Sequence, residues 1–347
     1  MNSRHFSLPA EWAEQDAVML TWPHPDTDWQ PILTKVEPVF VEICQAILRF
    51  ERLVIVCHNQ AIKAHVINLL EQVNADTNRV TFIIAPTNDT WARDHGPITL
   101  SSGNQIKALD FTFNGWGNKF DAALDNQINS ALFSSPSFNH IERKTIDLVL
   151  EGGGIESDGQ GHLLTTAQCI FNQNRNPQLA KEELTTRLLT LLGLNKALIL
   201  NHGDLIGDDT DAHIDTLCRF APNNQIVYTQ CDRQEDAHYQ DLAKMEAELK
   251  TFRQINGQPF KLVPLPLPEA KFDASGDRLP ATYANFLIIN NAVLVPVYQD
   301  INDTLAVSQM AKAFPEHEII AINCLPIIEQ YGSLHCLTMQ LPKGYFN

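Results

Sequence analysis

The residue whose type and surroundings best suit a nucleophile is Cys336, close to the C-terminal end of this 347-residue chain. A thiolate is nucleophilic and a thiol is not, so Cys336 needs a neighbour that favours loss of its proton, such as an imidazolium or a bound cation. The alternative is a small buried apolar side chain, which is the usual state of a free cysteine. Cys336 alone is therefore a weak signal, and its interpretation depends on the polar residues upstream.

Four clusters of polar residues upstream of Cys336 could supply the other groups of a catalytic site. They occupy residues 89–97, 151–154, 208–215 and 283–285. The third cluster contains His213, the best candidate for a general acid and base. His335 directly precedes Cys336, but in a strand it would point to the opposite face. We therefore expect His213, and not His335, to work with the thiol.

The carboxylates in these clusters favour a planar cation as the ligand. Asp94 and Asp215 would be costly to bury without partners, and a guanidinium matches carboxylate oxygens two at a time. Trp91 could stack on such a cation, or it could simply pack in the core. Glu151 precedes three glycines and could hold His213 or contact the substrate, or it could lie in a surface turn. This set suits attack by a thiol on a cationic carbon.

Composition excludes several classes of protein. The formal net charge is −16, from 41 acidic and 25 basic residues, which disfavours nucleic acid as a partner and is compatible with a cationic ligand. The seven cysteines form no CxxC pair, so reduced thiols in a cytoplasmic protein are the simplest account. We see no secretory signal and no segment long enough to span a bilayer, and so expect no membrane partner.

Short apolar runs alternate with stretches of helical periodicity, which predicts the α/β class. The order repeats: a strand with a polar cluster, an apolar strand, a helix, and another strand. Such units occupy residues 148–200, 213–265 and 282–323, and a fourth begins at Asp94. The fifth is split, with its first strand at 334–341 and its second at 17–22.

Five units in a fixed order predict a ring that is closed by pairing the first and last strands. The polar clusters would then fall on equivalent strands and converge on one centre. The alternative is an ordinary open α/β sheet.

Residues 211–215 also resemble a metal-binding signature of the manganese ureohydrolases, because carboxylates and imidazole suit Mn²⁺. That family needs a Gly-Asp-His element upstream and an Asp-x-Asp-x-x-Asp element downstream, and the sequence has neither. We therefore predict no essential metal and no cofactor. A metal-dependent ureohydrolase remains a less favoured alternative, as does a non-catalytic protein that binds cationic ligands.

Five motifs in one order resemble the agmatine deiminase family, which includes the bacterial peptidylarginine deiminase type and belongs to the guanidine-modifying superfamily. They occupy residues 91–97, 151–154, 172–177, 209–215 and 335–338. The match is collinear from Trp22 to Pro342. The resemblance implies a five-bladed pseudo-symmetric α/β propeller (the pentein fold), with residues 1–347 forming a single catalytic domain. It also implies a place in putrescine and polyamine biosynthesis, and it is compatible with a homo-oligomer.

The resemblance further implies that agmatine is converted to N-carbamoylputrescine and ammonia through a covalent thiouronium intermediate. The implied roles are the nucleophile for Cys336, the general acid and base for His213, the guanidinium clamp for Asp94 and Asp215, and the orientation of the histidine for Glu151.

Three more residues of the pocket take their roles from the same resemblance. Asp209 would take the distal amine, Trp91 would line the pocket, and Asn285 would lie near the site. His95, Ala212 and the segment 331–336 depart from the family's usual residues, so free or peptidyl arginine stays open as the substrate.

Overall fold

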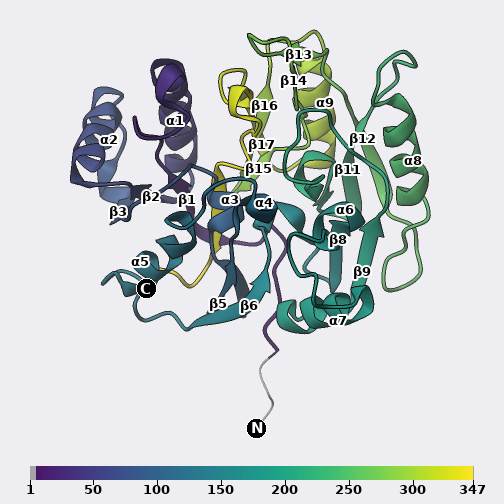
Figure 1. Cartoon of the computed structure of the whole chain (residues 1–347), viewed down its shortest axis with the longest axis horizontal. Helices are drawn as coiled ribbons and strands as arrows, with labels where there is room; N and C mark the ends of the chain where they lie inside the picture. Colours follow the sequence, from purple (N-terminus) through teal and green to yellow (C-terminus); the bar gives the residue numbers. More distant parts are fainter. Residues whose placement is uncertain (1–4, 347) are drawn as a thin grey trace.

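The computed structural model describes residues 5–346, which form strands and helices in alternation, so the α/β prediction is confirmed. Within these residues the strands make six separate sheets, and no sheet closes on itself. In Figure 1 the longer helices lie toward the outside of the molecule, while the short helices α3 (Ala92–His95) and α4 (Gly115–Asn118) lie nearer its middle.

Four of the sheets share one plan. The first strand pairs antiparallel with the middle strand, and the middle strand pairs parallel with the third. The sheets are β4-β5-β6 (Ile98–Ser102, Gln105–Thr112, Arg143–Val149), β7-β8-β9 (Glu156–Ser157, His162–Thr166, Lys196–Leu200), β10-β11-β12 (Cys218–Ala221, Gln225–Gln230, Lys261–Pro266) and β15-β16-β17 (Leu287–Ile289, Ala292–Val297, Glu318–Asn323). Tight turns can join the antiparallel pairs, whereas each parallel pair needs a longer crossover.

The fifth sheet joins the two ends of the chain. β18 (Thr338–Pro342) pairs antiparallel with β1 (Gln15–Thr21), with Met339 opposite Met19. β1 in turn pairs parallel with β2 (Arg52–Cys57), and β3 (Val80–Ile84) adds a fourth strand. The predicted pairing of the first and last strands is therefore confirmed. A sixth, two-stranded sheet consists of β13 (Lys271–Phe272) and β14 (Arg278–Leu279).

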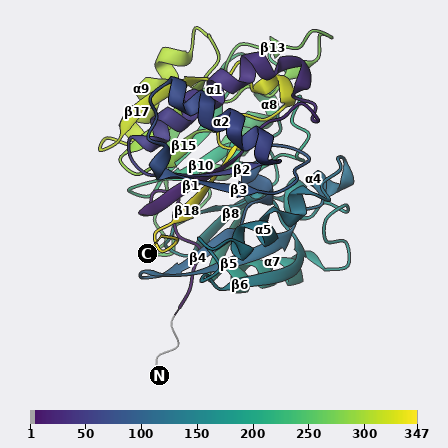
Figure 2. The ribbon, with the colours of Figure 1, turned by 90° about the vertical axis from the view of Figure 1, so that its left-hand side faces the viewer.

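The longer helices bury the faces that their periodicity predicts. In α1 (Leu33–Leu48), Val36, Phe40, Ile43 and Ile47 recur at helical spacing and are fully buried. Figure 2 shows α1 and α2 (Gln60–Gln72) on the same side of the sheet that contains β1, β2 and β3. The remaining helices are α5 (Ile128–Ser134), α6 (Ala167–Ile170), α7 (Lys181–Leu192), α8 (Tyr239–Leu249) and α9 (Asp303–Ala313).

The polar clusters do not lie on strands, and that part of the prediction is wrong. Each lies in a short segment just before the first strand of a sheet: α3 precedes β4, Gly152–Gly154 precedes β7, and Ile214–Thr216 precedes β10. Asn285 and Cys336 occupy the same place before β15 and β18. A single turn of helix is too short to be distinguished from a strand by its periodicity. The predicted convergence does not depend on this error, because α3 packs on Gly152–Gly154, which packs on Ile214–Thr216.

No helix among residues 5–346 is long and apolar enough to cross a membrane.

Candidate active site

A cavity of about 120 Å³ opens beside Cys336. Five aspartates line it, and its lining contains no lysine, arginine or histidine. The aspartates are Asp28, Asp89, Asp94, Asp208 and Asp209. Four aromatic residues, Trp91, Trp116, Phe120 and Tyr331, form much of the remaining wall. Such a cavity favours a ligand with positive charge and an apolar body, because neither a carboxylate nor a phosphate would find a cationic partner in it.

Asn285 holds the turn that carries Cys336. Its Oδ1 accepts hydrogen bonds from the backbone N–H groups of His335 (2.9 Å) and Cys336 (3.3 Å), while its Nδ2 lies 3.2 Å from the Cys336 Sγ. The sulfur is also 3.7 Å from Oδ2 of Asp215. One amide therefore fixes both the backbone and the sulfur, which gives Asn285 a definite structural part in the site.

The Cys336 thiol is not activated in the ligand-free protein. Burial raises the pKa of Cys336 well above its ordinary value, and the negative charges of Asp215 and Asp94 raise it further. Of the two activating neighbours that the sequence suggested, the structure therefore favours a bound cation. A positive ligand placed between these carboxylates would offset the charges that disfavour the thiolate.

Asp94 is buried, and its orientation is fixed by two donors. The backbone N–H of Gly153 donates to Oδ1 at 3.0 Å, and Nε1–H of Trp116 donates to Oδ2 at 3.0 Å. Burial raises the pKa of Asp94 to about 6; the charge of His213 opposes this rise and that of Asp215 adds to it. The orientation of the Asp94 carboxylate is therefore fixed, but neighbouring groups neutralise its negative charge only in part.

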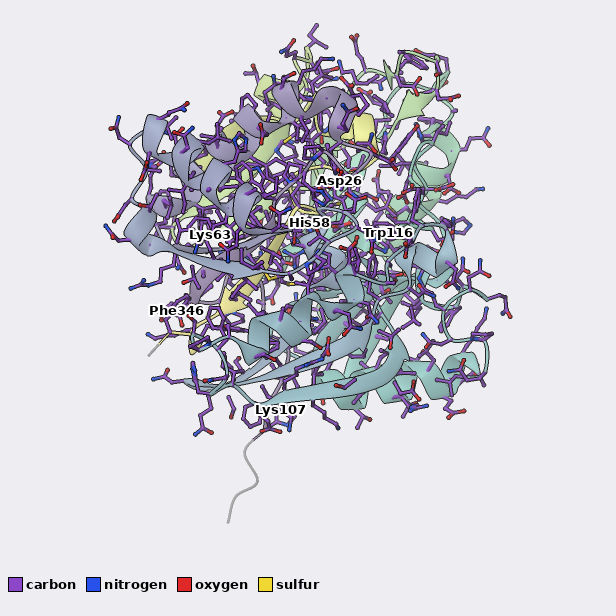
Figure 3. All side chains as sticks on the ribbon, turned by 60° about the vertical axis from the view of Figure 1, so that its left-hand side comes forward. Asp26, His58, Lys63, Lys107, Trp116 and Phe346 are labelled. Carbon is purple, nitrogen blue, oxygen red and sulfur yellow. The ribbon has the colours of Figure 1, made fainter. Side chains whose placement is uncertain are left out.

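Trp116 is a residue of the site that the sequence analysis missed. It has a left-handed backbone (φ 55°) between Gly115 and Gly117, which is uncommon for an aromatic residue. A side chain on Gly115 would meet the backbone oxygen of Phe120 at 2.2 Å, so the turn requires glycine there. In the view of Figure 3, Trp116 lies near the middle of the molecule and Lys107 at its lower edge. The signal available in the sequence was a tryptophan flanked by two glycines.

Asp215 is fully buried, and its two carboxylate oxygens have different surroundings. Its Oδ2 lies 2.7 Å from Nδ1 of His335. Its Oδ1 has no hydrogen-bond partner among the described residues. The expectation that His335 lies in a strand is wrong, because His335 and Cys336 lie in a turn. The ring of His335 is nevertheless not part of the cavity lining.

His213 is fully buried between two carboxylates. Its Nδ1 lies 3.6 Å from Oδ1 of Asp94, and its Nε2 lies 3.9 Å from Oε2 of Glu151, both longer than hydrogen bonds. Burial alone would lower the pKa of His213, but the charge of Asp94, followed by Cys169 and Glu151, raises it well above its ordinary value. The surroundings of the ring therefore favour the imidazolium, the form that can donate a proton.

Glu151 is buried against Arg175, a second residue to which the sequence analysis gave no role. Nε of Arg175 lies 2.8 and 3.1 Å from the two oxygens of Glu151, and its Nη1 lies 2.7 Å from Asp211. Burial raises the pKa of Glu151, but His213 and Arg175 outweigh that effect and hold it below its ordinary value. Glu151 is thus a fixed negative charge beside His213.

Gly153 shows how closely these groups converge. A Cβ at this position would lie 2.6 Å from Nδ1 of His213, 2.8 Å from Oδ1 of Asp94 and 3.2 Å from Oδ2 of Asp215. Any side chain would displace them, which explains why the glycine triplet follows Glu151. The structure therefore brings together the five residues to which the sequence gave catalytic roles: Cys336, His213, Glu151, Asp94 and Asp215. Asn285, expected near the site, lies against the sulfur.

The two remaining predicted residues, Asp209 and Trp91, line the cavity. Burial, followed by the charge of Asp208, raises the pKa of Asp209 to about 6. The ring of Trp91 lies against Gly332, where a Cβ would approach it to 2.2 Å. The segment just before Cys336 therefore packs directly on one wall of the cavity.

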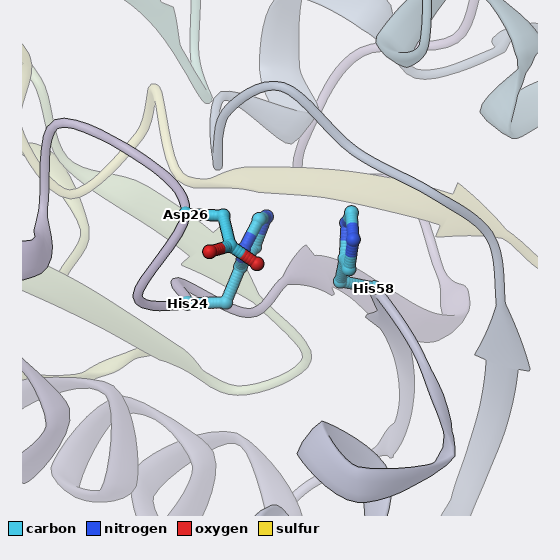
Figure 4. A group of neighbouring side chains, drawn as sticks. All are labelled: His24, Asp26 and His58. Carbon is cyan, nitrogen blue, oxygen red and sulfur yellow. The ribbon is translucent and has the colours of Figure 1, made fainter.

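Three groups of side chains among the described residues have donors close enough to share a metal ion. In His24, Asp26 and His58 the two rings stack, with centroids 4.0 Å apart and planes 29° apart (Figure 4). Nearly parallel rings do not aim their in-plane lone pairs at one point, and Nδ1 of His58 already accepts from the N–H of Thr87. This geometry does not favour a shared ion.

The other two groups contain carboxylates that are already paired with arginine. Glu151, Cys169 and His213 adjoin Arg175, while Glu11, Glu156 and His335 adjoin Arg219. In each group an arginine guanidinium already neutralises a carboxylate that a metal ion would need as a ligand. These donor sets fit their arginine partners better than they fit an added cation.

Comparison with known proteins agrees with this geometry. Residues 7–342 match the family described as Porphyromonas-type peptidyl-arginine deiminase. The chain is 31% identical over 344 residues to a Legionella pneumophila (strain Paris) protein named "Putative agmatine deiminase", with 98% of this chain and 96% of that protein covered.

Solved structures of deiminases also resemble this chain over nearly its whole length. A substrate-bound cysteine-to-serine variant of C. jejuni agmatine deiminase superposes with a TM-score of 0.91 at 39% identity, covering 99% of this chain and 98% of that one. A structure titled "Putative Arginine Deiminase from Porphyromonas gingivalis" has a TM-score of 0.91 at 47% identity, covering 99% and 100%.

Proposed function

The chain belongs to the Porphyromonas-type peptidyl-arginine deiminase family, and we propose that it is an agmatine deiminase, which hydrolyses agmatine to N-carbamoylputrescine and ammonia. The observation that carries the proposal is the cavity: Cys336 opens into it, five aspartates line it, and no cationic side chain does. Agmatine has a guanidinium at one end and an ammonium at the other, with an apolar chain between. An arginine substrate would add a carboxylate or a peptide backbone, for which the lining offers no cationic partner.

The fold that we propose for this function is a five-bladed pseudo-symmetric propeller forming a single catalytic domain. Its support is the common plan of four sheets and the closely similar plan of the fifth, which contains both ends of the chain. In each sheet the first strand follows directly on a residue of the site, so repetition of one unit accounts for the convergence of five distant clusters.

Binding is the first step of the proposed mechanism. The guanidinium enters between Asp94 and Asp215, and Oδ1 of Asp215 accepts one of its N–H groups. Asp209 takes the distal ammonium, and Trp91 covers the chain. The positive charge offsets the carboxylates that hold the pKa of Cys336 high, so the thiol loses its proton to solvent when the substrate is bound.

The chemical steps that follow consume no reactant other than agmatine and water. The Cys336 thiolate adds to the guanidinium carbon, His213 gives its proton to the departing nitrogen, and ammonia leaves. A thiouronium links the substrate to the sulfur. The neutral His213 takes a proton from water, whose oxygen adds to the same carbon. The C–S bond of this adduct breaks and its hydroxyl proton passes to solvent, which releases the ureido product and restores the thiolate and the imidazolium. Glu151 stabilises the charged form of the ring throughout.

One assay tests this function against its alternatives. The protein is incubated with agmatine, free arginine or a peptidyl arginine, each with and without EDTA, and ammonia, ureido product and urea are measured. We expect N-carbamoylputrescine and ammonia from agmatine, unaffected by EDTA, and at least about a hundredfold lower kcat/KM with the arginines. Urea formation that EDTA abolishes would instead identify a ureohydrolase.

The matched control for this assay is Cys336→Ser. The serine hydroxyl has nearly the size of the thiol but is a far poorer nucleophile here, so turnover should fall by at least about 10⁴-fold while the melting temperature stays within a few degrees. Cys324→Ser changes a buried cysteine outside the cavity and should retain activity. Full activity of Cys336→Ser would remove the nucleophile from the proposal.

A further inference from the structure

His335 connects Asp215 to a buried group of charges on the side away from the cavity. The ring is fully buried, and its Nδ1 lies 2.7 Å from Oδ2 of Asp215. Its Nε2 lies 2.9 Å from Nη2 of Arg219 and 3.0 and 3.1 Å from the two oxygens of Glu11. We call His335, Arg219, Glu11 and Glu156 the rear network.

The partners of His335 determine where its proton lies. A guanidinium can only donate, so Nε2 accepts from Arg219. A neutral ring that accepts at Nε2 carries its proton at Nδ1, and that proton is donated to Asp215. Glu11 does not need a proton from the ring, because it also contacts Arg219, Nη1 of Arg93 at 3.0 Å and Nε2 of Gln340 at 2.9 Å.

The charges around the ring support the neutral form. Burial lowers the pKa of His335, and the nearby charges of Arg219 and Arg93 lower it further, against the opposing effects of Glu11 and Asp215. The two carboxylates of the rear network, Glu11 and Glu156, both contact Arg219. Arg93 also pairs with Glu11 and supplies the second positive charge, so the two carboxylates are balanced without a charge on the imidazole.

We propose that His335 is a positioning residue: as the neutral Nδ1–H tautomer, it fixes Oδ2 of Asp215 and so leaves Oδ1 free to receive the guanidinium. The same hydrogen bond stabilises negative charge on the oxygen that lies 3.7 Å from the Cys336 sulfur. Asp215 is thus correctly turned before the substrate arrives. This inference rests on the proposed function. It adds His335, whose ring touches neither the substrate nor the nucleophile, to the residues that serve the reaction.

The rear network also gives the segment before β1 a part in the site. Glu11 is contributed by that segment, Arg219 by β10, and Glu156 by β7. Arg219 is fully buried, and its Nη1 donates to the backbone oxygen of Phe286 at 2.7 Å. Elements far apart in the sequence therefore hold the ring in one orientation, which a positioning role requires.

Two amide substitutions distinguish the contribution of Nδ1 of His335 from that of Nε2. In His335→Asn, the amide N–H can replace Nδ1–H and donate to Asp215, but the contacts at Nε2 are lost. In His335→Gln, the longer amide can replace the contacts at Nε2, but the donor to Asp215 is lost. We expect His335→Asn to keep kcat/KM within about fivefold of the unmodified protein, and His335→Gln to lose about 10- to 100-fold, as is usual when a hydrogen bond to a charged group is removed.

The pH profile gives the readout that a merely structural role would not change. A hydrogen bond donated to a carboxylate favours its charged form, so losing the Nδ1–H donor should move the acid limb of kcat/KM to higher pH in His335→Gln, while His335→Asn should leave it in place. Equal losses, the reverse order, or no loss in either variant would overturn the inference. If the unmodified protein does not turn over agmatine, the proposed function fails instead, so the two failures are distinguishable.

A matched control and a measurement on the unmodified protein complete the test. His162 is another buried histidine whose Nδ1 contacts an aspartate, Asp158, outside the cavity, and its Asn and Gln variants should leave kcat/KM and the acid limb unchanged. If the His335 variants do not fold, ¹⁵N NMR of the unmodified protein reads the tautomer directly. A proton on Nδ1 alone between about pH 6 and 8 supports the inference, and an imidazolium or an Nε2–H tautomer contradicts it.

Discussion

The two sides of Asp215 differ in how completely their polar groups are satisfied. On the cavity side, Oδ1 of Asp215 and both ring nitrogens of His213 are buried without hydrogen-bond partners among the described residues. On the other side, Arg219, Glu11 and His335 contact one another. Buried polar groups normally find partners, so the unsatisfied side is the one that awaits a ligand. The comparison agrees with a reacting centre on the cavity side of Asp215.

The charges follow the same division. The cavity side gathers Asp94 and Asp215 beside a thiol, with no arginine or lysine in the cavity lining. In the rear network, Arg219 pairs with both glutamates and Arg93 pairs with Glu11. A cluster of unbalanced carboxylates is unfavourable in the empty protein and becomes favourable when a cation binds. Variants on the cavity side should therefore cost activity, and variants that break the ion pairs of Arg219 should cost stability.

The largest effect on stability is expected from Arg219→Gln. Removing this guanidinium leaves Glu156 buried without a cation and leaves the partly buried Glu11 with Arg93 alone. Breaking a buried ion pair in this way costs about 3–5 kcal/mol. Urea unfolding monitored by circular dichroism measures the loss. A change below about 1 kcal/mol would show that the rear network does not stabilise the fold.

The opposite pattern is expected for Asp94→Asn. The amide keeps the size of the side chain but removes half of the guanidinium clamp, so kcat/KM should fall by about 30- to several-thousandfold, the range for losing one member of a buried charge pair. The melting temperature should stay the same or rise, because a carboxylate with an unfavourable burial has been removed. Steady-state kinetics and thermal unfolding of the same preparation check both parts, and a large loss of stability would contradict the assignment.

A smaller effect is expected from Trp116→Phe. The ring still fills its place in the wall, but the N–H donated to Asp94 is lost, which should lower kcat/KM by about 10- to 100-fold. Trp12→Phe, outside the cavity, is the matched control and should be nearly neutral. If both substitutions have the same effect on kcat/KM, Trp116 contributes only packing.

The pH dependence should show the smallest of these effects, and it follows from two carboxyls. Burial raises the pKa of both Asp94 and Asp209 to about 6, so each loses its negative charge as the pH falls below that value. Because binding needs both charges, log(kcat/KM) should fall with a slope approaching about two below pH 6. In Asp209→Asn the slope should approach about one, at a lower overall rate. An unchanged slope in Asp209→Asn would exclude Asp209 from the titration.

The parts of the fold that the sequence predicted are those with strong local patterns. β1, β2 and β16 are runs of apolar residues, and α1 keeps a helical period throughout. β4 and β5 escaped detection because their ends are polar, as in Ser101 and Gln105. The turns before the first strands escaped because a single turn carries no measurable period.

The site was predicted residue by residue only where a motif marked it. Arg175 and Trp116 act through contacts with Glu151 and Asp94 that lie 24 and 22 residues away in the sequence, and no local pattern encodes such pairs. The segment before β18 was taken for a strand, so the contact between His335 and Asp215 was not predicted. The raised pKa of the Cys336 thiol depends on burial and on two distant carboxylates, which only the folded chain reveals.

The most direct test of the central claim is a crystal structure of the Cys336→Ser variant with agmatine. The guanidinium should lie between Asp94 and Asp215, one of its N–H groups should donate to Oδ1 of Asp215, and its carbon should lie about 3–3.5 Å from the hydroxyl oxygen that replaces the sulfur. A guanidinium bound outside this clamp, or one whose distal ammonium instead occupies it, would contradict the account.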